Sequence, residues 1–480
     1  MEEKDSLGLN VTKAGDFSEW YSQVVQKADL ADYTSVSGCM VFKPYSYEIW
    51  EKTRDWFDRK IKQLGHKNAY FPLLIPERLL KKESEHVEGF SPEVAWVTHA
   101  GKSKLAERLA IRPTSETIMY ESYAKWIRSH RDLPLLLNQW CNVVRWEFKY
   151  PKPFIRTREF LWQEGHTAHA TEEDADREVM SILDIYTDLI ENYYAIPVIR
   201  GKKSDKEKFA GALYTTTMEA LMPDGKALQM GTSHNLGQNF SKAFGISFID
   251  KDEKTKYVWQ TSWGIATRLI GAMIMVHGDD KGLIIPPRIA PIQAVVIPII
   301  FKKNREELVQ KAKEIKDLLK GIEVTVDDRD EYSVGWKYNE WELKGVPVRI
   351  EVGPRDIQKD QVVIVRRDTG DKAFVRMSDI RGKVKETLSS IQDNIFKKAQ
   401  DFLHNNTVET LDWKEFQQAI KDKKMVKTQW CGSSECEELI KDKSDGASSR
   451  CIPFDQPEVL GACVHCGNKA LYSVYFSKAY

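Results

Sequence analysis

The sequence predicts an α+β domain built around an antiparallel sheet, followed by an α/β domain and a small C-terminal α/β domain that carries a cluster of cysteines. Three observations lead to this prediction. Aromatic-rich runs that suit strands alternate with polar loops and two long amphipathic helices up to about residue 280. Shorter strands and helices alternate from about residue 287 to 395. Most of the seven cysteines lie close to the C-terminus.

The length and charge of the chain limit its organisation and its partners. At 480 residues the chain is too long for one ordinary hydrophobic core, and its length suggests about two to four domains. The changes in character along the chain place three domains at 1–285, 286–395 and 396–480. A group of three prolines between residues 286 and 291 forms a stiff connector at the first boundary. Lys plus Arg and Asp plus Glu both number 71. A nucleic-acid partner must therefore be bound by local basic patches, because the chain has no net charge to attract it.

Two long helices are expected in the first domain. Apolar residues recur at helical spacing over residues 49–64, and Gly65 follows as a residue suited to a helix C-cap. The apolar run at 69–75 is interrupted by a proline, so we expect an irregular or edge strand there. Thr171 and Asp174 resemble a capping box and predict the start of the second helix.

A predicted hairpin in the first domain carries residues suited to nucleotide binding. A strand is expected over 135–148, and Arg145 and the segment 156–160 lie on two strands joined by a loop. Arginine can hold a phosphate through several donors, and a neighbouring phenylalanine can stack on a base. A solvated hairpin with surface arginines is the alternative.

The segment 261–271 is expected to join a loop of small residues to a helix. Its glycines allow a substrate to approach the backbone, and Arg268 can point along one face of the helix toward a polyanion. A buried helix packed through its glycines, with one surface arginine, is the alternative for this segment alone.

The second domain is expected to be a compact α/β module. A buried strand is predicted at 294–300, followed by a helix that Asn304 and Glu307 cap and that runs to Leu319. The remaining strands are predicted at 323–326, 346–352, 362–365 and 373–375. A long charged helix from about 379 to 404 leads to the C-terminal domain.

Several segments, taken together and in this order, resemble motifs of known enzymes. The signature motifs of class II aminoacyl-tRNA synthetases are similar to the segments 65–74, 145–147 and 261–268. The amino-acid and ATP loops of the prolyl-tRNA synthetase family are similar to the segments 112–117, 160–166, 228–234 and 262–264. The resemblance runs from about residue 15 to the C-terminus and covers the archaeal and eukaryotic type, which has an extra C-terminal zinc domain. It implies the class II synthetase fold for the first domain and an anticodon-binding function for the second.

The resemblance implies that L-proline is activated with ATP to prolyl-adenylate and transferred to the 3′ end of tRNA(Pro). Arg145 would be the leading catalytic residue and Arg268 the next, acting by holding reactants in line and by stabilising charge that develops on phosphorus. Glu116 can pair with the secondary ammonium of proline, and Thr114 can accept a hydrogen bond from it. Arg145 can hold the proline carboxylate beside the α-phosphate.

The other site residues are also assigned by the resemblance. The proline pocket would be formed by Thr114, Glu116, Arg145, Trp162, His166, His234, Ser262 and Gly264. ATP would be bound by Arg145, Glu147, Arg156, Thr157, Phe160, Gln229, Thr232 and Arg268. Mg²⁺ is expected as a cofactor that shields the polyphosphate, and Gln229 is the candidate magnesium contact.

The C-terminal cysteines have the spacing of a metal site. Cys431 and Cys436 are separated by four residues and Cys463 and Cys466 by two, which is typical of a four-thiolate structural zinc site. Cys451 is left over, and an odd, clustered count suits a metal better than a disulfide framework. Scattered buried thiols are the alternative.

No editing domain is expected in this chain. About ninety residues separate Glu164 from Thr255, too few for the large editing insertion that the bacterial type of the family carries between its second and third motifs. Amino acids must therefore be discriminated in the synthetic pocket, and we expect measurable activation of alanine or cysteine. The charged stretch 340–356 of the second domain mixes donors and acceptors that could bind guanine edges, although a solvated charged face explains any one of its residues.

The remaining expectations concern location, assembly and rival functions. The N-terminus has no apolar signal segment and no run is long enough to cross a membrane, so we expect a cytoplasmic protein. The resemblance implies a homodimer with tRNA(Pro), L-proline and ATP as partners. Three alternatives stay open: a ligase with dual proline and cysteine activity, a catalytically silent relative that binds tRNA as a sensor, and a zinc-containing nucleic-acid-binding protein without enzymatic activity.

Overall fold

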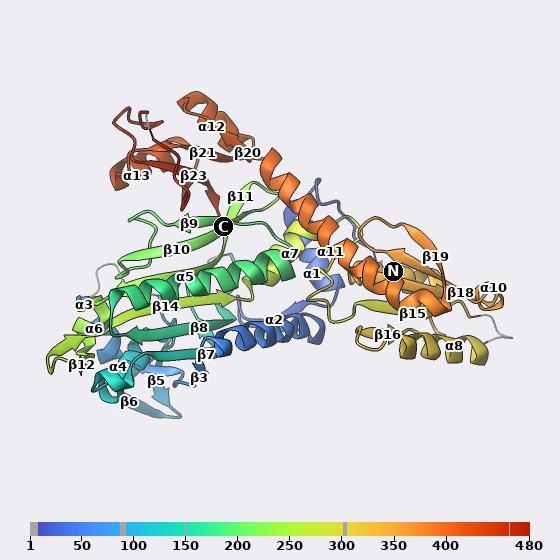
Figure 1. Ribbon diagram of the computed structural model, residues 1–480, viewed down its shortest axis with the longest axis horizontal. Helices are drawn as coiled ribbons and strands as arrows, with labels where there is room; N and C mark the ends of the chain where they lie inside the picture. Colours follow the sequence, from blue (N-terminus) through green and yellow to red (C-terminus); the bar gives the residue numbers. More distant parts are fainter. Residues whose placement is uncertain (1–7, 87–92, 148–149, 301–304, 460) are drawn as a thin grey trace.

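The computed structural model describes residues 8–86, 93–147, 150–300, 305–459 and 461–480. Within these residues the strands form one sheet of eleven strands, one of five strands and three smaller sheets. Figure 1 shows the two larger sheets on opposite sides of the molecule, with helix α11 (Ile380–Asn405) running from the smaller of them toward the C-terminal elements.

The first domain mixes long helices and antiparallel strands, as predicted. Its helices are α1 (Phe17–Lys27), α2 (Pro44–Gln63), α3 (Glu77–His86), α4 (Glu116–Trp126), α5 (Glu172–Asp188), α6 (Asn239–Phe244) and α7 (Arg268–His277), with a 3-10 helix at His130–Asp132 and a π-helix at Leu189–Tyr193. Its strands are β1 (Ala31–Tyr33), β2 (Met40–Phe42), β3 (Lys67–Asn68), β4 (Leu74–Pro76), β5 (Trp96–Ala100), β6 (Ser103–Ile111), β7 (Leu135–Val144), β8 (Glu159–His169), β9 (Ile199–Lys202), β10 (Tyr214–Leu221), β11 (Lys226–Gly237), β12 (Ser247–Ile249), β13 (Thr255–Tyr257) and β14 (Trp259–Ala266).

The eleven-stranded sheet joins the first and the C-terminal domains. The C-terminal strands are β20 (Thr407–Glu409), β21 (Met425–Trp430), β22 (Ala447–Pro453) and β23 (Tyr472–Ala479). The strand order is β20-β21-β23-β22-β9-β10-β11-β14-β8-β7-β3. Along this order neighbours are antiparallel except β20 with β21 and β3 with β7, and β11 and β23 make an additional parallel pairing. The predicted antiparallel sheet is confirmed, and the C-terminal strands extend it through the pairing of β22 with β9.

Local capping signals marked the end of α2 and the start of α5 correctly, whereas α2 begins at Pro44, before the apolar run at 49–64. Helix α2 ends at Gln63, and Gly65 just beyond it has φ +95°, a conformation that glycine adopts without steric cost. The Thr171 hydroxyl accepts a hydrogen bond from the backbone N–H of Asp174 at 3.2 Å and caps α5. Local hydrogen bonding therefore determines where these helices begin and end.

The structure differs from the sequence-based prediction at three places in the sheet. The strand expected over 135–148 ends at Val144, so Arg145 lies just beyond β7 and not on it. The expected small-residue loop over residues 261–266 is wrong, because these residues belong to β14, which pairs with both β11 and β8. Small residues suit this position because three strands and their side chains pack closely there. Residues 156–158 lie in the hairpin loop and not on a strand, since β8 begins at Glu159.

Helices α1, α2, α5 and α7 pack against the sheet and bury a large apolar core. Trp20, Phe57, Tyr186, Trp263 and Met273, one from each of these helices and from β14, are all at most 2% exposed. Figure 1 shows α5 lying along β11 and β14. These helices hold the strands rigidly, which fixes the side chains on the strands that line the cavity described below.

The second domain is the predicted α/β module. Its strands are β15 (Ala294–Pro298), β16 (Val324–Val326), β17 (Val348–Val352), β18 (Gln361–Arg366) and β19 (Lys372–Arg376), in the order β16-β15-β17-β18-β19. Its helices are α8 (Arg305–Leu318), α9 (Val334–Leu343), α10 (Pro354–Gln358) and α11, with a 3-10 helix at Met377–Asp379. The predicted cap residue Asn304 lies outside the described residues.

The C-terminal domain adds helices α12 (Trp413–Lys421) and α13 (Ser434–Lys443) to its four strands. Phe416, Trp430 and Phe476 form the centre of its core. The last residue of this domain contacts the first domain, because the Tyr480 hydroxyl donates a hydrogen bond to Asp224 at 2.6 Å. In the described part of the chain, no helix is both long enough and apolar enough to span a bilayer.

Candidate active site

A cavity of about 300 Å³ opens on the large sheet where β8, β10, β11 and β14 meet. Twelve of the residues predicted from the sequence line it: Thr114, Glu116, Arg145, Phe160, Trp162, His166, Gln229, Thr232, His234, Ser262, Gly264 and Arg268. They come from five separate stretches of the chain, which the sheet brings together. The cavity therefore collects most of the predicted proline and ATP residues in one place.

Strand β8 contributes one face to the cavity. Side chains alternate along a strand, so Phe160, Trp162, Glu164 and His166 point to the same side. The opposite face of β8 packs on the core, where a Cβ added at Gly165 would meet the Trp263 ring at 2.2 Å. Glycine at this position leaves room for the Trp263 ring, which lies over the core-facing side of β8.

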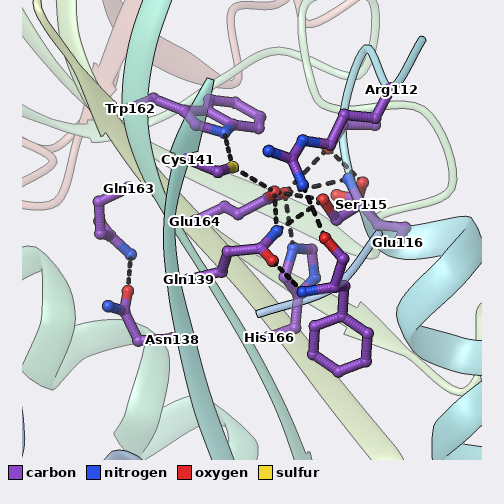
Figure 2. A network of polar contacts seen from close by, with 12 residues as sticks. Arg112, Ser115, Glu116, Asn138, Gln139, Cys141, Trp162, Gln163, Glu164 and His166 are labelled. Carbon is purple, nitrogen blue, oxygen red and sulfur yellow. Dashed lines mark hydrogen bonds and ion pairs between the residues drawn. The ribbon is translucent and has the colours of Figure 1, made fainter. Parts of the chain in front are cut away.

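Glu164 is the centre of a buried polar network at the base of the cavity (Figure 2). Its carboxylate accepts hydrogen bonds from the backbone N–H of Ser115 at 3.0 Å, from Gln139 at 3.1 Å and from His166 at 3.1 Å. The Ser115 hydroxyl also donates to it. These contacts fix the loop that precedes α4 to β8 and β7.

Glu116 lies beside this network with its carboxylate bonded to the Thr114 hydroxyl. One ligand atom each from Glu116, Glu164 and His166 lies within 4.8 Å of the others. Glu116 is 4% exposed and Glu164 2%, so two carboxylates share a buried site with one imidazole. Such a site favours a cation, whether the imidazolium of His166 or the ammonium group of a ligand.

Protonation in the network follows from these contacts. Burial by itself would raise the pKa of Glu164, but the hydrogen bonds from His166, Ser115 and Gln139 outweigh it and lower the pKa to about 2. Burial would lower the pKa of His166, but Glu116 and Glu164 raise it above the usual value. The polar partners of His234 are the Thr215 and Thr232 hydroxyls, and burial together with the neighbouring His166 lowers its pKa to about 3. His234 is therefore neutral at physiological pH.

Two guanidinium groups line the other part of the cavity. The Arg145 side chain donates to the Pro113 carbonyl at 3.0 Å, and its guanidinium lies 5.7 Å from the centre of the Phe160 ring and 5.2 Å from that of Trp162. Burial, followed by the nearby charge of Arg145, lowers the pKa of Arg268 to about 10. Arg145 and Arg268 are neighbouring cations in a site that is largely shielded from water, and together they create a positive potential. This part of the cavity therefore favours the binding of an anion.

Three predicted ATP residues lie outside the lining of the cavity. Glu147 is exposed in the turn after β7, and Thr157 is 2% exposed in the hairpin loop. Arg156 lies close enough to Arg268 to help lower the pKa of Arg268. The roles assigned to these three residues stay predictions.

The sequence-based prediction missed several residues of the cavity. Glu164, Glu207, Phe209 and Thr215 also line it. Glu164 could have been found from strand periodicity, because it lies between Trp162 and His166 at the spacing of two. Glu207 and Phe209 come from the loop between β9 and β10, which carries no sequence signal for a cavity.

The four predicted metal ligands come together in the C-terminal domain. The sulfur atoms of Cys431, Cys436, Cys463 and Cys466 all lie within 4.8 Å of one another. The Sγ–Sγ distances are 3.7 Å for Cys436 and Cys463 and 3.6 Å for Cys431 and Cys466. Four thiolates at about 2.3 Å from a tetrahedral zinc ion would lie about 3.8 Å apart, so this arrangement fits zinc and is much too wide for disulfides.

The leftover Cys451 does not belong to the cluster. It is 1% exposed on β22, and its thiol contacts the Ile199 carbonyl of β9 at 3.9 Å. Burial raises its pKa above the usual value. Cys451 is therefore an inert packing residue where the C-terminal domain meets the first domain.

Comparison with protein families agrees with the three-part organisation. Residues 96–277 match the tRNA synthetase class II core domain (G, H, P, S and T). Residues 293–387 match the anticodon binding domain, and residues 413–480 match the prolyl-tRNA synthetase C-terminal domain. The fold and the site thus define a class II aminoacyl-tRNA synthetase.

Curated relatives identify the family within that class. The chain is 55% identical over 469 residues to the proline–tRNA ligase of Natranaerobius thermophilus, with 97% of this chain and 96% of the relative covered. It is 54% identical to that of Clostridium novyi, with 97% of each covered, and 53% identical to that of Alkaliphilus oremlandii, with 97% and 96% covered. The chain belongs to the proline–tRNA ligase family.

Proposed function

We propose that this chain activates L-proline with ATP and transfers it to the 3′ end of tRNA(Pro). The observation that carries the proposal is that Glu116, Arg145 and Phe160 line one cavity, together with Arg268. The Glu116 carboxylate can pair with an ammonium group, the Arg145 guanidinium can bind a carboxylate or a phosphate, and the Phe160 ring can stack on a base. One cavity can therefore bind an amino acid and a nucleotide side by side.

The first step joins proline to the α-phosphate of ATP. An oxygen of the proline carboxylate attacks the α-phosphorus, the bond to the bridging oxygen breaks, and pyrophosphate leaves with the bonding electrons. Arg145 holds the carboxylate beside the α-phosphate, and Arg268 holds the phosphates. Both stabilise the charge that develops on phosphorus, so no protein nucleophile is needed.

The second step uses the tRNA. A hydroxyl oxygen of its 3′-terminal ribose attacks the acyl carbon of prolyl-adenylate, and AMP leaves while the hydroxyl proton passes to a phosphate oxygen or to solvent. The same cavity serves both steps, because the adenylate remains bound between Arg145 and the proline pocket.

The proline pocket is selective through charge and shape. The buried carboxylate of Glu116, held by Thr114, pairs with the secondary ammonium of proline. Trp162, His166 and His234 surround the ring, and Ser262 and Gly264 form the wall on β14. Neutral His234 and the aromatic rings suit an apolar pyrrolidine.

ATP would occupy the side of the cavity lined by Phe160, Gln229 and Thr232, with Glu147, Arg156 and Thr157 approaching from the hairpin. Mg²⁺, when bound, supplies charge neutralisation for the polyphosphate and the departing pyrophosphate. Gln229 would hold it, because its side-chain carbonyl is a hard oxygen ligand in the lining of the cavity.

The C-terminal cysteines would hold a structural zinc ion. All four positions of a tetrahedral ion are filled by Cys431, Cys436, Cys463 and Cys466, so no position remains for a substrate. Zinc would therefore stabilise the fold of the C-terminal domain and take no part in the reaction.

Assembly and location are part of the same proposal. The domains would divide at 1–285, 286–395 and 396–480, with the second reading the anticodon of tRNA(Pro). A homodimer is supported by exposed aromatic rings near the first motif, with Tyr70 72% and Trp126 52% exposed. The protein would act in the cytoplasm, where ATP, proline and tRNA(Pro) are present and where charged tRNA is used.

The function is tested by proline-dependent exchange of label between pyrophosphate and ATP, followed by charging of purified tRNA(Pro). We expect exchange with proline at least 100-fold more efficient than with alanine or cysteine. Equal exchange with cysteine would indicate a dual activity. Binding of tRNA without exchange would indicate a silent relative that acts as a sensor, and it would end the proposal.

A further inference from the structure

The loop of residues 203–213, between β9 and β10, lies between the cavity and the C-terminal domain. On the cavity side it contributes Glu207 and Phe209 to the lining. The Phe209 ring centre is 4.9 Å from that of His234, and the backbone N–H of Phe209 donates to Thr215 at 2.9 Å. Thr215 in turn contacts His234 Nδ1 at 2.8 Å. Any shift of this loop would therefore move a wall of the proline pocket.

The other side of the same loop is bound by the C-terminal domain. Ser449 donates to the Ser204 hydroxyl at 3.1 Å, and Lys203 donates to the Arg450 carbonyl at 3.1 Å. Lys206 forms an ion pair with Glu438 of α13. Figure 1 shows α13 and β23 above β9 and β10.

Arg450 is the residue that joins these contacts to the cavity. Its side chain is 7% exposed and donates to Glu219 of β10 at 3.1 and 3.3 Å. The same guanidinium lies 3.6 Å from the carboxylate of Glu207. Glu219 is 0% exposed and also accepts from Lys203 at 2.7 Å. One arginine from the C-terminal domain thus contacts both a buried carboxylate of the sheet and a carboxylate in the lining of the cavity.

The buried charges restrict how the side chains of this network can pair. A buried cation needs a carboxylate partner, and Lys203 and Arg450 share Glu219, so Arg450 also needs Glu207. The backbone beside the network is equally tight, because a Cβ at Gly201 would lie 2.0 Å from the Ile452 carbonyl. The Glu207 backbone is held within the loop by Ser204, and its carboxylate is held from outside the first domain by Arg450.

We propose that Arg450 is a positioning residue of the proline pocket. By holding Glu207 and Glu219 it fixes the 203–213 loop, and through the loop it fixes Phe209 against His234. The C-terminal domain then contributes to amino-acid binding without touching the substrate. This inference rests on the function proposed above.

Two substitutions separate the charge of Arg450 from its geometry. Arg450→Met keeps an unbranched side chain but removes the charge, and Glu219 keeps Lys203 as its partner, so the fold should survive. Arg450→Lys keeps the charge but loses the planar guanidinium that reaches two carboxylates. Lys427→Met is the matched control, because Lys427 lies in the same domain on β21 and pairs on the surface with Glu409 at 3.3 Å.

The kinetic readout is pyrophosphate exchange, with proline and ATP varied separately. For Arg450→Met we expect the proline KM to rise about tenfold, with kcat changed less than threefold and the ATP KM less than twofold. Arg450→Lys should show an intermediate rise, and Lys427→Met none. Hydrogen exchange should become faster in peptides that cover residues 203–213 while those that cover β8 remain protected.

Two results would overturn the inference. One is an unchanged proline KM in Arg450→Met, and the other is a fall in kcat that accompanies faster hydrogen exchange throughout the first domain. Wild-type protein in the same assay tests the proposed function separately. If it shows no proline-dependent exchange, that function fails, and hydrogen exchange of the 203–213 loop still decides whether Arg450 positions it.

Discussion

Arg145 is the single side chain on which the proposed chemistry depends most. It lines the cavity and its guanidinium is held by the Pro113 carbonyl and two aromatic rings. We predict that Arg145→Ala lowers kcat/KM for proline-dependent exchange by about 10²–10³-fold, because a fixed charge aimed at the reacting phosphate is lost. Arg381→Ala, exposed on α11, is the control and should exchange normally. Near-normal exchange by Arg145→Ala would contradict the assigned role.

The buried position of His277 predicts that the unfolding free energy of the protein depends on pH. Burial, opposed by a hydrogen bond to the Tyr194 carbonyl and assisted by Lys13, holds its pKa at about 4, below the usual 6.5. Between these values the unfolded chain binds a proton that the folded protein excludes, so stability falls as the pH falls. His277→Gln keeps a donor toward Tyr194 but cannot titrate.

The measurement is urea denaturation of both proteins at pH 7.5 and pH 5, followed by tryptophan fluorescence. The wild type should lose on the order of 2 kcal/mol more unfolding free energy than His277→Gln over this range. Equal losses in the two proteins would show that His277 titrates normally in the folded state.

Single residues of the cavity could be predicted where they lie in a family motif or at alternate positions along a strand. Thr114, Glu116 and Arg145 lie in such segments and line the cavity, although their roles stay predictions. Phe209 lies in no such motif or strand. A loop carries it to the cavity, and its neighbour His234 is distant in sequence, so no local pattern could predict the contact.

At the scale of elements, the packing of β8 on β14 makes its own prediction. Gly165→Ala would place a Cβ 2.2 Å from the Trp263 ring, and overpacking of this kind costs about 1–3 kcal/mol. We expect a lower melting temperature and weaker proline binding, because Glu164 and His166 of the cavity flank the altered residue. Gly382→Ala on α11 has open space around it and should leave the melting temperature unchanged or slightly raised. Similar melting temperatures for both variants would contradict the close packing.

Helices were easier to predict than strands for a physical reason. The limits of α2 and α5 depend on hydrogen bonds within a few residues, such as that from Asp174 to Thr171. Strand β14 depends on β8 and β11, which are distant in sequence, so the segment 261–266 could be mistaken for a loop.

At the scale of the whole molecule, the cysteine cluster predicts a metal requirement. We expect one zinc ion per chain, lost in Cys436→Ser and kept in Cys39→Ser, whose thiol lies outside the cluster. Removing zinc with a chelator should unfold residues 413–480, because thiolate ligands hold a small core together. The measurement combines metal analysis with hydrogen exchange. Purified protein that lacks metal but keeps a cooperatively folded C-terminal domain would refute the site.

The absence of a separate insertion in the described residues 164–255 predicts incomplete discrimination. These residues form α5, α6 and β9 to β12 of the first domain, and one methylene in an apolar pocket is worth only about 1–3 kcal/mol. We expect measurable activation of alanine or cysteine and no hydrolysis of alanyl-tRNA(Pro) by this chain. Rapid deacylation of that tRNA by the purified protein would contradict the prediction.

The sequence by itself determined the end of α2, the start of α5, the presence of the hairpin, the four clustered cysteines and the class of reaction, because each is encoded in short segments. Only the tertiary structure decided that Glu164 links β7, β8 and the loop before α4, and that the C-terminal strands extend the large sheet. It alone revealed the contact between Arg450 and Glu219, which are 231 positions apart. Such contacts join residues that are distant in sequence and form only when the whole chain has folded, so no local pattern of residues can predict them.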